Sequence, residues 1–69
     1  MTGVFEALGD ATRRHVLALL SAGEQPAGAI VSALQARAPI SQPAVSQHLR
    51  VLRDAGLVSV RTDLSLIHI

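Results

Sequence analysis

Apolar and polar residues repeat with a helical period between Ser41 and Gly56, and they give this segment two sides of different chemistry. At about 100° per residue, one side collects the apolar residues Ala44, Val45, Leu49, Val51, Leu52 and Ala55. The other side collects the polar residues Gln42, Ser46, Gln47, Arg50, Arg53 and Asp54. Ser41 is a favourable N-cap and Gly56 a favourable C-terminal stop. The pattern predicts a helix over residues 42–55 that packs with one side and exposes the other.

Three shorter helices are predicted ahead of this one. The first apolar segment ends at Gly9 and is too short to be stable unless it packs on something else; its residues at helical spacing are Val4, Phe5 and Leu8. Asp10 is a favourable N-cap for a second helix over residues 11–20. Pro26 suits the first turn of a third helix. The expected buried stripes are Val16, Leu17 and Leu20 in the second helix and Ile30, Val31 and Leu34 in the third.

The connections between these elements indicate the fold. Only residues 37–40 separate the third and fourth helices, which must therefore meet at a sharp angle, as in a helix-turn-helix. After Gly56 the period changes to alternation, with Val58 and Val60 on one side, and predicts a strand. The candidate partner is residues 64–69, which alternate weakly but offer no Gly or Asn for a tight turn. The predicted fold is mostly α, a winged helix-turn-helix with a three- to four-helix core followed by a β-strand or a short, incomplete wing.

The composition fits a small helical domain. A chain of 69 residues forms one domain with a small core, and the absence of cysteine removes disulfides and thiolate metal sites as means of stabilising it. Oligomerisation is the remaining candidate. No apolar run approaches the ~20 residues that span a bilayer, and the N-terminus lacks the pattern of a signal peptide. We therefore expect a cytoplasmic protein with no membrane partner.

Positive charge gathers near the predicted fourth helix. The net charge is only +1, and the pI of 9.2 reflects the absence of Lys, Tyr and Cys. Between residues 41 and 61, however, the charged residues are the arginines Arg50, Arg53 and Arg61 and a single acidic residue, Asp54. Glutamine, serine and arginine read base edges and bind phosphates, and a helix fits the major groove of DNA. The pattern favours a DNA-recognition helix. Two alternatives stay open: an ordinary solvated face, and a face that contacts another protein.

Two segments carry a resemblance to a known family. They are residues 5–14, FEALGDATRR, and residues 40–58, ISQPAVSQHLRVLRDAGLV. On these segments the chain resembles the ArsR/SmtB family of small bacterial winged-helix repressors, and the likeness extends from Val4 to about Thr62. The resemblance implies a transcriptional regulator that binds an inverted-repeat operator in double-stranded DNA as a homodimer and leaves the DNA when an inducer binds.

The residues expected to bind DNA lie on or near the predicted fourth helix: Ser41, Gln42, Pro43, Ser46, Gln47, Arg50, Arg53 and Arg61. We place Gln42, Ser46 and Gln47 against base edges because they occupy the N-terminal half of its polar side. The arginines are candidates for phosphate contacts, and Arg50 also for a guanine edge. Ser41 is expected to cap the helix, and capping alone is favoured over an added phosphate contact.

Two residues fall outside this scheme. His48 projects toward the apolar side of the helix, so we expect it to pack there rather than to read a base. Arg13 lies among the apolar residues of the second helix, and two roles stay open for it. One is a structural bond to a carboxylate or a helix C-terminus, and the other is a contact with phosphate.

The chain departs from the family where members that sense metals by thiols carry a Cys-x-Cys pair. Here it has Pro26 and Gly28, whose side chains cannot bind a metal. The histidines also lack the spacing of a metal site, so we expect no metal and no cofactor. Ser46 and His48 point in different directions and no acidic pair is suitably spaced, so we expect no catalytic residues and no enzyme.

The last residues depart from the family as well. Residues 63–69 lack the arginines and the long final helix that members have there, and they resemble the translated read-through of a sequencing adapter. We therefore expect an incomplete family domain over residues 1–62, followed by a non-family tail of artefactual origin. Such a chain is expected to be monomeric or unstable at micromolar concentration.

Overall fold

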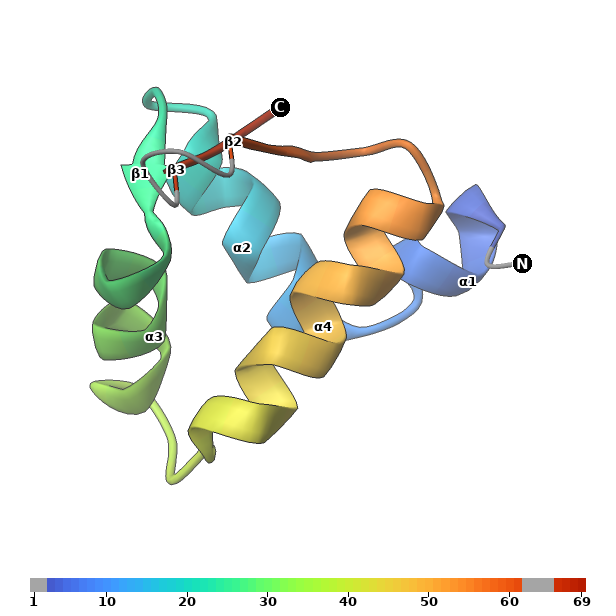
Figure 1. The fold of residues 1–69 in the computed structure, drawn as a ribbon. Coiled ribbons are helices and arrows are strands. Elements are labelled where there is room, and N and C mark those ends of the chain that lie inside the picture. Colours follow the sequence, from blue (N-terminus) through green and yellow to red (C-terminus); the bar gives the residue numbers. More distant parts are fainter. Residues whose placement is uncertain (1–2, 62–65) are drawn as a thin grey trace.

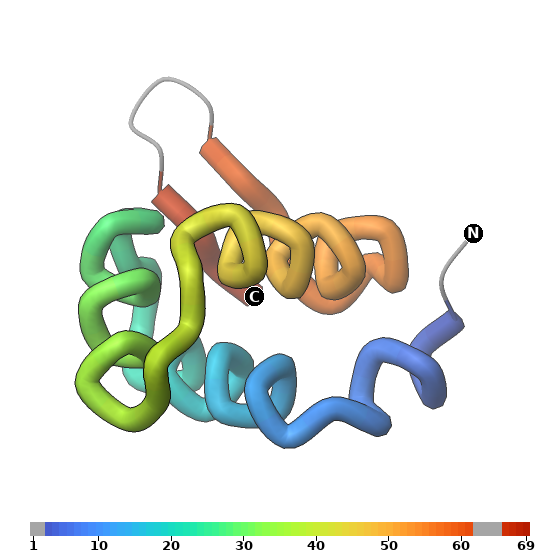
Figure 2. Tube along the Cα trace, turned by 90° about the horizontal axis from the view of Figure 1, so that it is seen from below, coloured from blue at the N-terminus to red at the C-terminus, as the bar shows by residue number. Residues whose placement is uncertain are grey.

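The computed structural model describes residues 3–61 and 66–69 and confirms a mostly helical, winged helix-turn-helix fold. The elements are α1 (Val4–Leu8), α2 (Ala11–Leu20), β1 (Gln25–Pro26), α3 (Ala27–Gln35), α4 (Gln42–Asp54), β2 (Ser59–Arg61) and β3 (Leu66–His68). In Figures 1 and 2, α3 and α1 lie at opposite ends of the molecule. The helix α4 packs against both α2 and α3. It forms the helix-turn-helix pair with α3, and α2 supports this pair on its inner side.

The helix boundaries follow from local capping. At the start of α2, Asp10 Oδ1 accepts hydrogen bonds from two backbone N–H groups of the first turn, at 2.7 and 3.1 Å. At the start of α4, Ser41 Oγ accepts a hydrogen bond from the N–H of Ala44 at 3.2 Å. Both predicted N-caps are confirmed, and a cap of this kind contributes about 1 kcal/mol. Gly56 follows α4 with a φ of 77°, a left-handed conformation that glycine adopts without strain.

The core joins the four helices to the sheet. Its buried residues are Ala7, Val16, Leu20, Ile30, Leu34, Val45, Leu52, Val58 and Ile67. Each apolar stripe predicted for α2, α3 and α4 supplies two of them. Five other stripe residues pack against this core while partly exposed: Leu17, Val31, Leu49, Val51 and Ala55. The core therefore holds α4 by its apolar side, as the helical pattern predicted.

The packing of α1 differs from the pattern expected for it. Phe5 is 94% exposed and Val4 is 45% exposed, whereas Ala7 is completely buried. Because α1 has only five residues, few of its positions can face α2, and a small alanine at that contact lets the two backbones approach closely. Val4 and Phe5 are left on the surface, whereas Leu8 is half-buried.

The three strands form an antiparallel sheet in the order β1-β3-β2, which makes β3 the central strand. Ile67 in β3 pairs with Gln25 on one side and with Val60 on the other, and it is only 2% exposed. The candidate partner of the predicted strand therefore does pair with it, over Leu66–His68 (Figure 2). The turn that would join the two strands lies in residues 62–65, outside the described residues. Although β1 was not predicted, its edge position tolerates Pro26, which has no N–H to donate.

Candidate DNA interface

The polar side of α4 faces outward. Its exposed residues are Gln42, Pro43, Ser46 and Gln47 in the N-terminal half and Arg50, Arg53 and Asp54 in the C-terminal half. On the opposite side, Val45 and Leu52 are completely buried, so the apolar side of α4 faces the core and the polar side faces outward. The outward presentation predicted from the sequence is confirmed. Amide, hydroxyl and guanidinium groups thus stand on a rigid element, in a form that can bond to bases and phosphates.

The three arginines near α4 are engaged differently. Arg50 makes no hydrogen bond or ion pair with any residue that the structure describes. Arg53 Nε lies 4.0 Å from Oδ1 of its neighbour Asp54, and both side chains are about half exposed, so this contact contributes little. Arg61 Nη1 donates to Oε2 of Glu24 at 3.3 Å. Arg50 is therefore the arginine with the greatest freedom to reach a ligand.

Two open hollows flank α4, and both are lined by Ser46 and Arg50. One lies toward the sheet and is also lined by Val60 of β2. The other follows the outer side of the helix past Gln47. Because the hollows are open rather than enclosed, they suit an extended ligand such as a polymer backbone better than a small molecule.

The carboxylate of Glu24 contacts the last residue of β2 and the last residue of β3. Its Oε2 lies 3.3 Å from Nη1 of Arg61 and 3.7 Å from Nδ1 of His68. No sequence pattern pointed to this cluster, because its members are far apart in the chain. Arg61, expected at a phosphate, already has a carboxylate partner, so a phosphate would have to displace Glu24.

Arg13 and His48 meet on the inner side of α4. The guanidinium of Arg13 donates to the carbonyl oxygens of Ala7 at 2.8 Å and Glu6 at 3.1 Å, both at the C-terminal end of α1. Its Nη1 lies 3.3 Å from Nδ1 of His48. Of the two roles left open for Arg13, the structural one is thus confirmed, with a helix C-terminus rather than a carboxylate as its partner. His48 is half-buried, in agreement with its predicted packing role.

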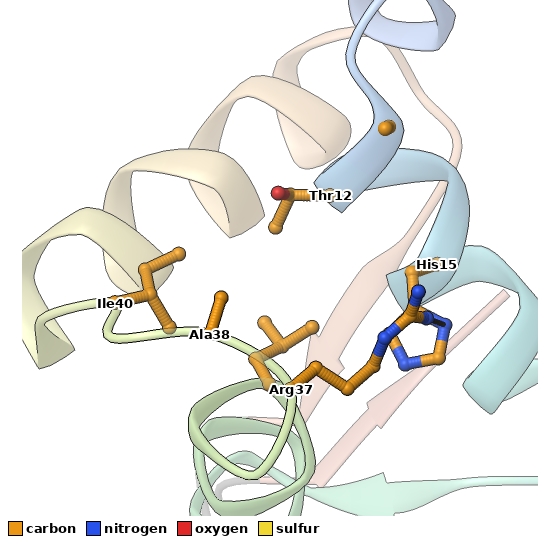
Figure 3. A pocket seen from close by; sticks show the side chains of 7 residues that line it. Thr12, His15, Arg37, Ala38 and Ile40 are labelled. Carbon is orange, nitrogen blue, oxygen red and sulfur yellow. Dashed lines mark hydrogen bonds between the residues drawn. The ribbon is translucent and has the colours of Figure 1, made fainter.

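The turn between α3 and α4 is braced by two side chains. Gln35 Nε2 donates to the carbonyl oxygen of Ile40 at 3.2 Å, and Arg37 Nη1 donates to Nδ1 of His15 at 2.7 Å. Figure 3 shows Arg37 and His15 meeting beside a hollow of about 190 Å³ between α2 and the turn. No local pattern in the sequence predicted this pair. Together these bonds support the angle at which α4 leaves α3.

The N-cap of α2 carries a perturbed carboxyl group. Burial opposes ionisation of Asp10, but the hydrogen bonds from the backbone N–H groups of Arg13 and Thr12 favour the charged form. The nearby side chains of His48 and Arg13 favour it too, and together these interactions hold the pKa of Asp10 below its usual value. The ionised carboxylate is therefore the form that caps the helix.

A helix-turn-helix domain family matches residues 8–61, a span that includes α2, α3, α4 and β2. The chain belongs to the ArsR-type helix-turn-helix transcriptional regulators. This ArsR-type chain is 41% identical over 59 residues to the transcriptional repressor SdpR of Bacillus subtilis (strain 168). It is 44% identical over 57 residues to the HTH-type transcriptional regulator Rv2034 of Mycobacterium tuberculosis. These alignments cover 86% and 83% of the chain.

A third relative, 44% identical over 59 residues, is the "Probable mercury resistance operon repressor" of Streptomyces lividans. The ArsR-type chain spans 61%, 50% and 44% of the lengths of the three relatives. Within residues 3–61 and 66–69, no group of three His, Cys, Asp or Glu residues is arranged to hold a metal ion. In the same residues, no helix has the length and apolar character needed to cross a membrane.

Proposed function

We propose that this chain is the DNA-reading part of a transcriptional repressor and that it binds an inverted-repeat operator through α4, the recognition helix. The observation that carries the proposal is the exposed polar side of α4, held in place by the buried Val45 and Leu52. The names of two relatives, both repressors, support the direction of regulation. The protein acts on DNA in the bacterial cytoplasm.

Each exposed residue of the recognition helix has a proposed role. Gln42, Ser46 and Gln47 read base edges, because the N-terminal residues of such a helix reach the floor of the major groove. Pro43, between them, offers an apolar surface to a thymine methyl group. Arg50, free of internal partners, binds a phosphate or a guanine edge.

Two further residues, Arg53 and Arg61, have phosphate contacts as their proposed roles, and Ser41 has a capping role. Arg53 lies one turn beyond Arg50 and its contact with Asp54 is weak, so it is available to a phosphate. Arg61 binds phosphate once the duplex replaces Glu24 as its partner. Ser41 primarily caps the helix, since its hydroxyl oxygen already accepts the Ala44 N–H.

The proposed functional unit of the whole protein is a homodimer. Two recognition helices related by a two-fold axis contact half-sites about one helical turn apart and convert two weak contacts into one specific contact. We place the partner at α1, where Val4 and Phe5 are neighbouring exposed apolar side chains, because adjoining apolar groups on a surface can mark a protein–protein contact.

The proposed regulatory input does not involve thiolate chemistry at α3. This chain carries Pro26 and Gly28 at the positions of the family's cysteine pair and has no cysteine anywhere in its 69 residues. We assign no metal and no cofactor to these residues, and we propose a binding protein rather than an enzyme.

The test is a selection from random duplexes with the purified chain. Affinity is then measured by fluorescence anisotropy for the enriched sequence, called the selected duplex, and for a scrambled duplex of equal composition. Enrichment of a recurring half-site, bound more weakly as salt rises, supports the reading role of α4. Its enrichment as an inverted repeat with half-sites about 10 base pairs apart supports the pairing of two chains as well. No enrichment, together with salt-independent binding, refutes the proposal and favours a winged helix that contacts another protein.

A further inference from the structure

A single side chain of α2 joins the end of α1 to the inner side of the recognition helix. Arg13 donates from Nε to the carbonyl oxygen of Ala7 at 2.8 Å and from Nη2 to that of Glu6 at 3.1 Å. Its Nη1 lies 3.3 Å from Nδ1 of His48. Because a guanidinium only donates, Nδ1 of His48 is the acceptor, and the ring proton of the neutral histidine lies on Nε2.

The planar guanidinium makes this connection directional. Its donors lie in one plane at fixed angles, so the two bonds to α1 determine where the third donor points. The carbonyl groups at the end of a helix carry its negative pole, which an arginine stabilises. With only five residues, α1 is not stable as an isolated helix, so its place depends on Arg13 and on the buried Ala7.

The position of His48 on α4 allows it to accept this hydrogen bond from Arg13. It is half-buried on the inner side of α4, one turn from Val45 and from Leu52, which are both completely buried. The preceding residue, Gln47, is exposed on the polar side. A rotation of α4 that breaks the bond to Arg13 would therefore also displace Gln47 and the other groups on that side.

We propose that Arg13 and His48 are positioning residues for DNA recognition: their bond holds the recognition helix at the rotation that fits the major groove. Neither residue contacts DNA. The same arginine also bonds to the end of α1, so the positions of α1 and of the recognition helix are linked through one side chain. The proposal rests on the function proposed for α4. It adds that DNA sequence specificity also depends on the Arg13–His48 contact on the inner side of that helix.

Two substitutions at His48 test the bond itself. His48→Leu has similar size but no acceptor, whereas His48→Asn places its Oδ1 near the position of the histidine Nδ1. We expect His48→Leu to weaken binding to the selected duplex about tenfold, the usual effect of losing a hydrogen bond to a charged group. Binding to the scrambled duplex should change by less than about twofold, and His48→Asn should restore the selected duplex to within about threefold. Equal losses in the two variants would overturn the proposal.

Arg14 provides a matched control for Arg13. It also donates to a carbonyl of α1, from Nη1 to Leu8 at 2.6 Å, but it does not contact His48. Arg13→Met should reduce discrimination between the two duplexes, Arg14→Met should not, and adding His48→Leu to Arg13→Met should cause no further loss. Equal effects of the two arginine substitutions would also overturn the proposal. Circular dichroism verifies that each variant is folded. If Arg13→Met is not folded, the comparison of His48→Leu with His48→Asn tests the proposal.

Gln42→Ala, measured alongside, separates this inference from the proposed function. Unchanged discrimination by Gln42→Ala refutes the reading role of α4 itself. Reduced discrimination by Gln42→Ala, with no difference between His48→Leu and His48→Asn, refutes only the positioning role. Reduced discrimination by Gln42→Ala and by His48→Leu, with recovery in His48→Asn, supports both.

Discussion

Replacing Ile67 by alanine tests whether β3 belongs to the stable fold. Ile67 is 2% exposed, pairs with Gln25 and Val60, and contributes to the core. Truncating a buried isoleucine to alanine costs about 2–5 kcal/mol, and we expect about 3 kcal/mol because a core this small can partly collapse around the cavity. The whole domain has an unfolding free energy on the order of 3–10 kcal/mol. One substitution should thus remove a large part of the stability.

The assay is urea unfolding followed by far-ultraviolet circular dichroism, because the chain has no Trp or Tyr to report by fluorescence. Ile69→Ala is the matched control: it makes the same change two residues further on, at a side chain that is 63% exposed, and should cost less than about 0.5 kcal/mol. If Ile67→Ala costs no more than Ile69→Ala, β3 is not docked, and residues 63–69 are a tail outside the domain.

Four further predictions concern α4 and the helix caps. Arg50→Gln should reduce the slope of log affinity against log salt by nearly one unit for the selected duplex, and an unchanged slope would mean that Arg50 binds no phosphate. Gln42→Ala should relax specificity at one or two base pairs by about 1–3 kcal/mol each in competition with single-base variants of that duplex; equal weakening for every sequence would contradict a base contact. Ser41→Ala should lower the unfolding free energy by about 1 kcal/mol, whereas Ser41→Asn, which keeps a capping oxygen, should nearly preserve it. Asp10 has a lowered pKa in the folded state, so its charged cap stabilises the protein fully above the ordinary aspartate value of about 3.9 and less as the pH falls through the lower folded value. The stability advantage of the wild type over Asp10→Asn should therefore shrink below about pH 4, and a constant difference across that range would exclude the carboxylate charge as its source.

The features that could be predicted from the sequence are those determined locally. Asp10 and Ser41 cap their helices through N–H groups two or three residues away, and Gly56 supplies the positive φ that ends α4. The burial of Val45 and Leu52 follows from the period of the helix. The exposed side of the candidate DNA interface was therefore predictable residue by residue.

The features that could not be predicted depend on contacts between distant segments. His15 and Arg37 are 22 positions apart, and Glu24 and Arg61 are 37 apart, so no periodicity pairs them. The two residues of β1 form a strand only because β3 pairs with them. The sequence left the role of Arg13 open because the carbonyl groups that accept its hydrogen bonds belong to a helix of five residues, whose position depends on tertiary packing.

The way the arginines are distributed limits how this chain can bind DNA. Arg13 and Arg14 bond to carbonyl groups of α1, Arg37 bonds to His15, and Arg61 bonds to Glu24. These cations serve the fold, which leaves Arg50 and Arg53 as the ones readily available to phosphate in each chain. Because counterion release scales with the number of phosphates bound, one or two contacts give a slope of only about −1 to −2 per chain. Sequence-independent attraction is then weak, so the proposed function requires that affinity come from base contacts made by α4 and from pairing two recognition helices on one operator.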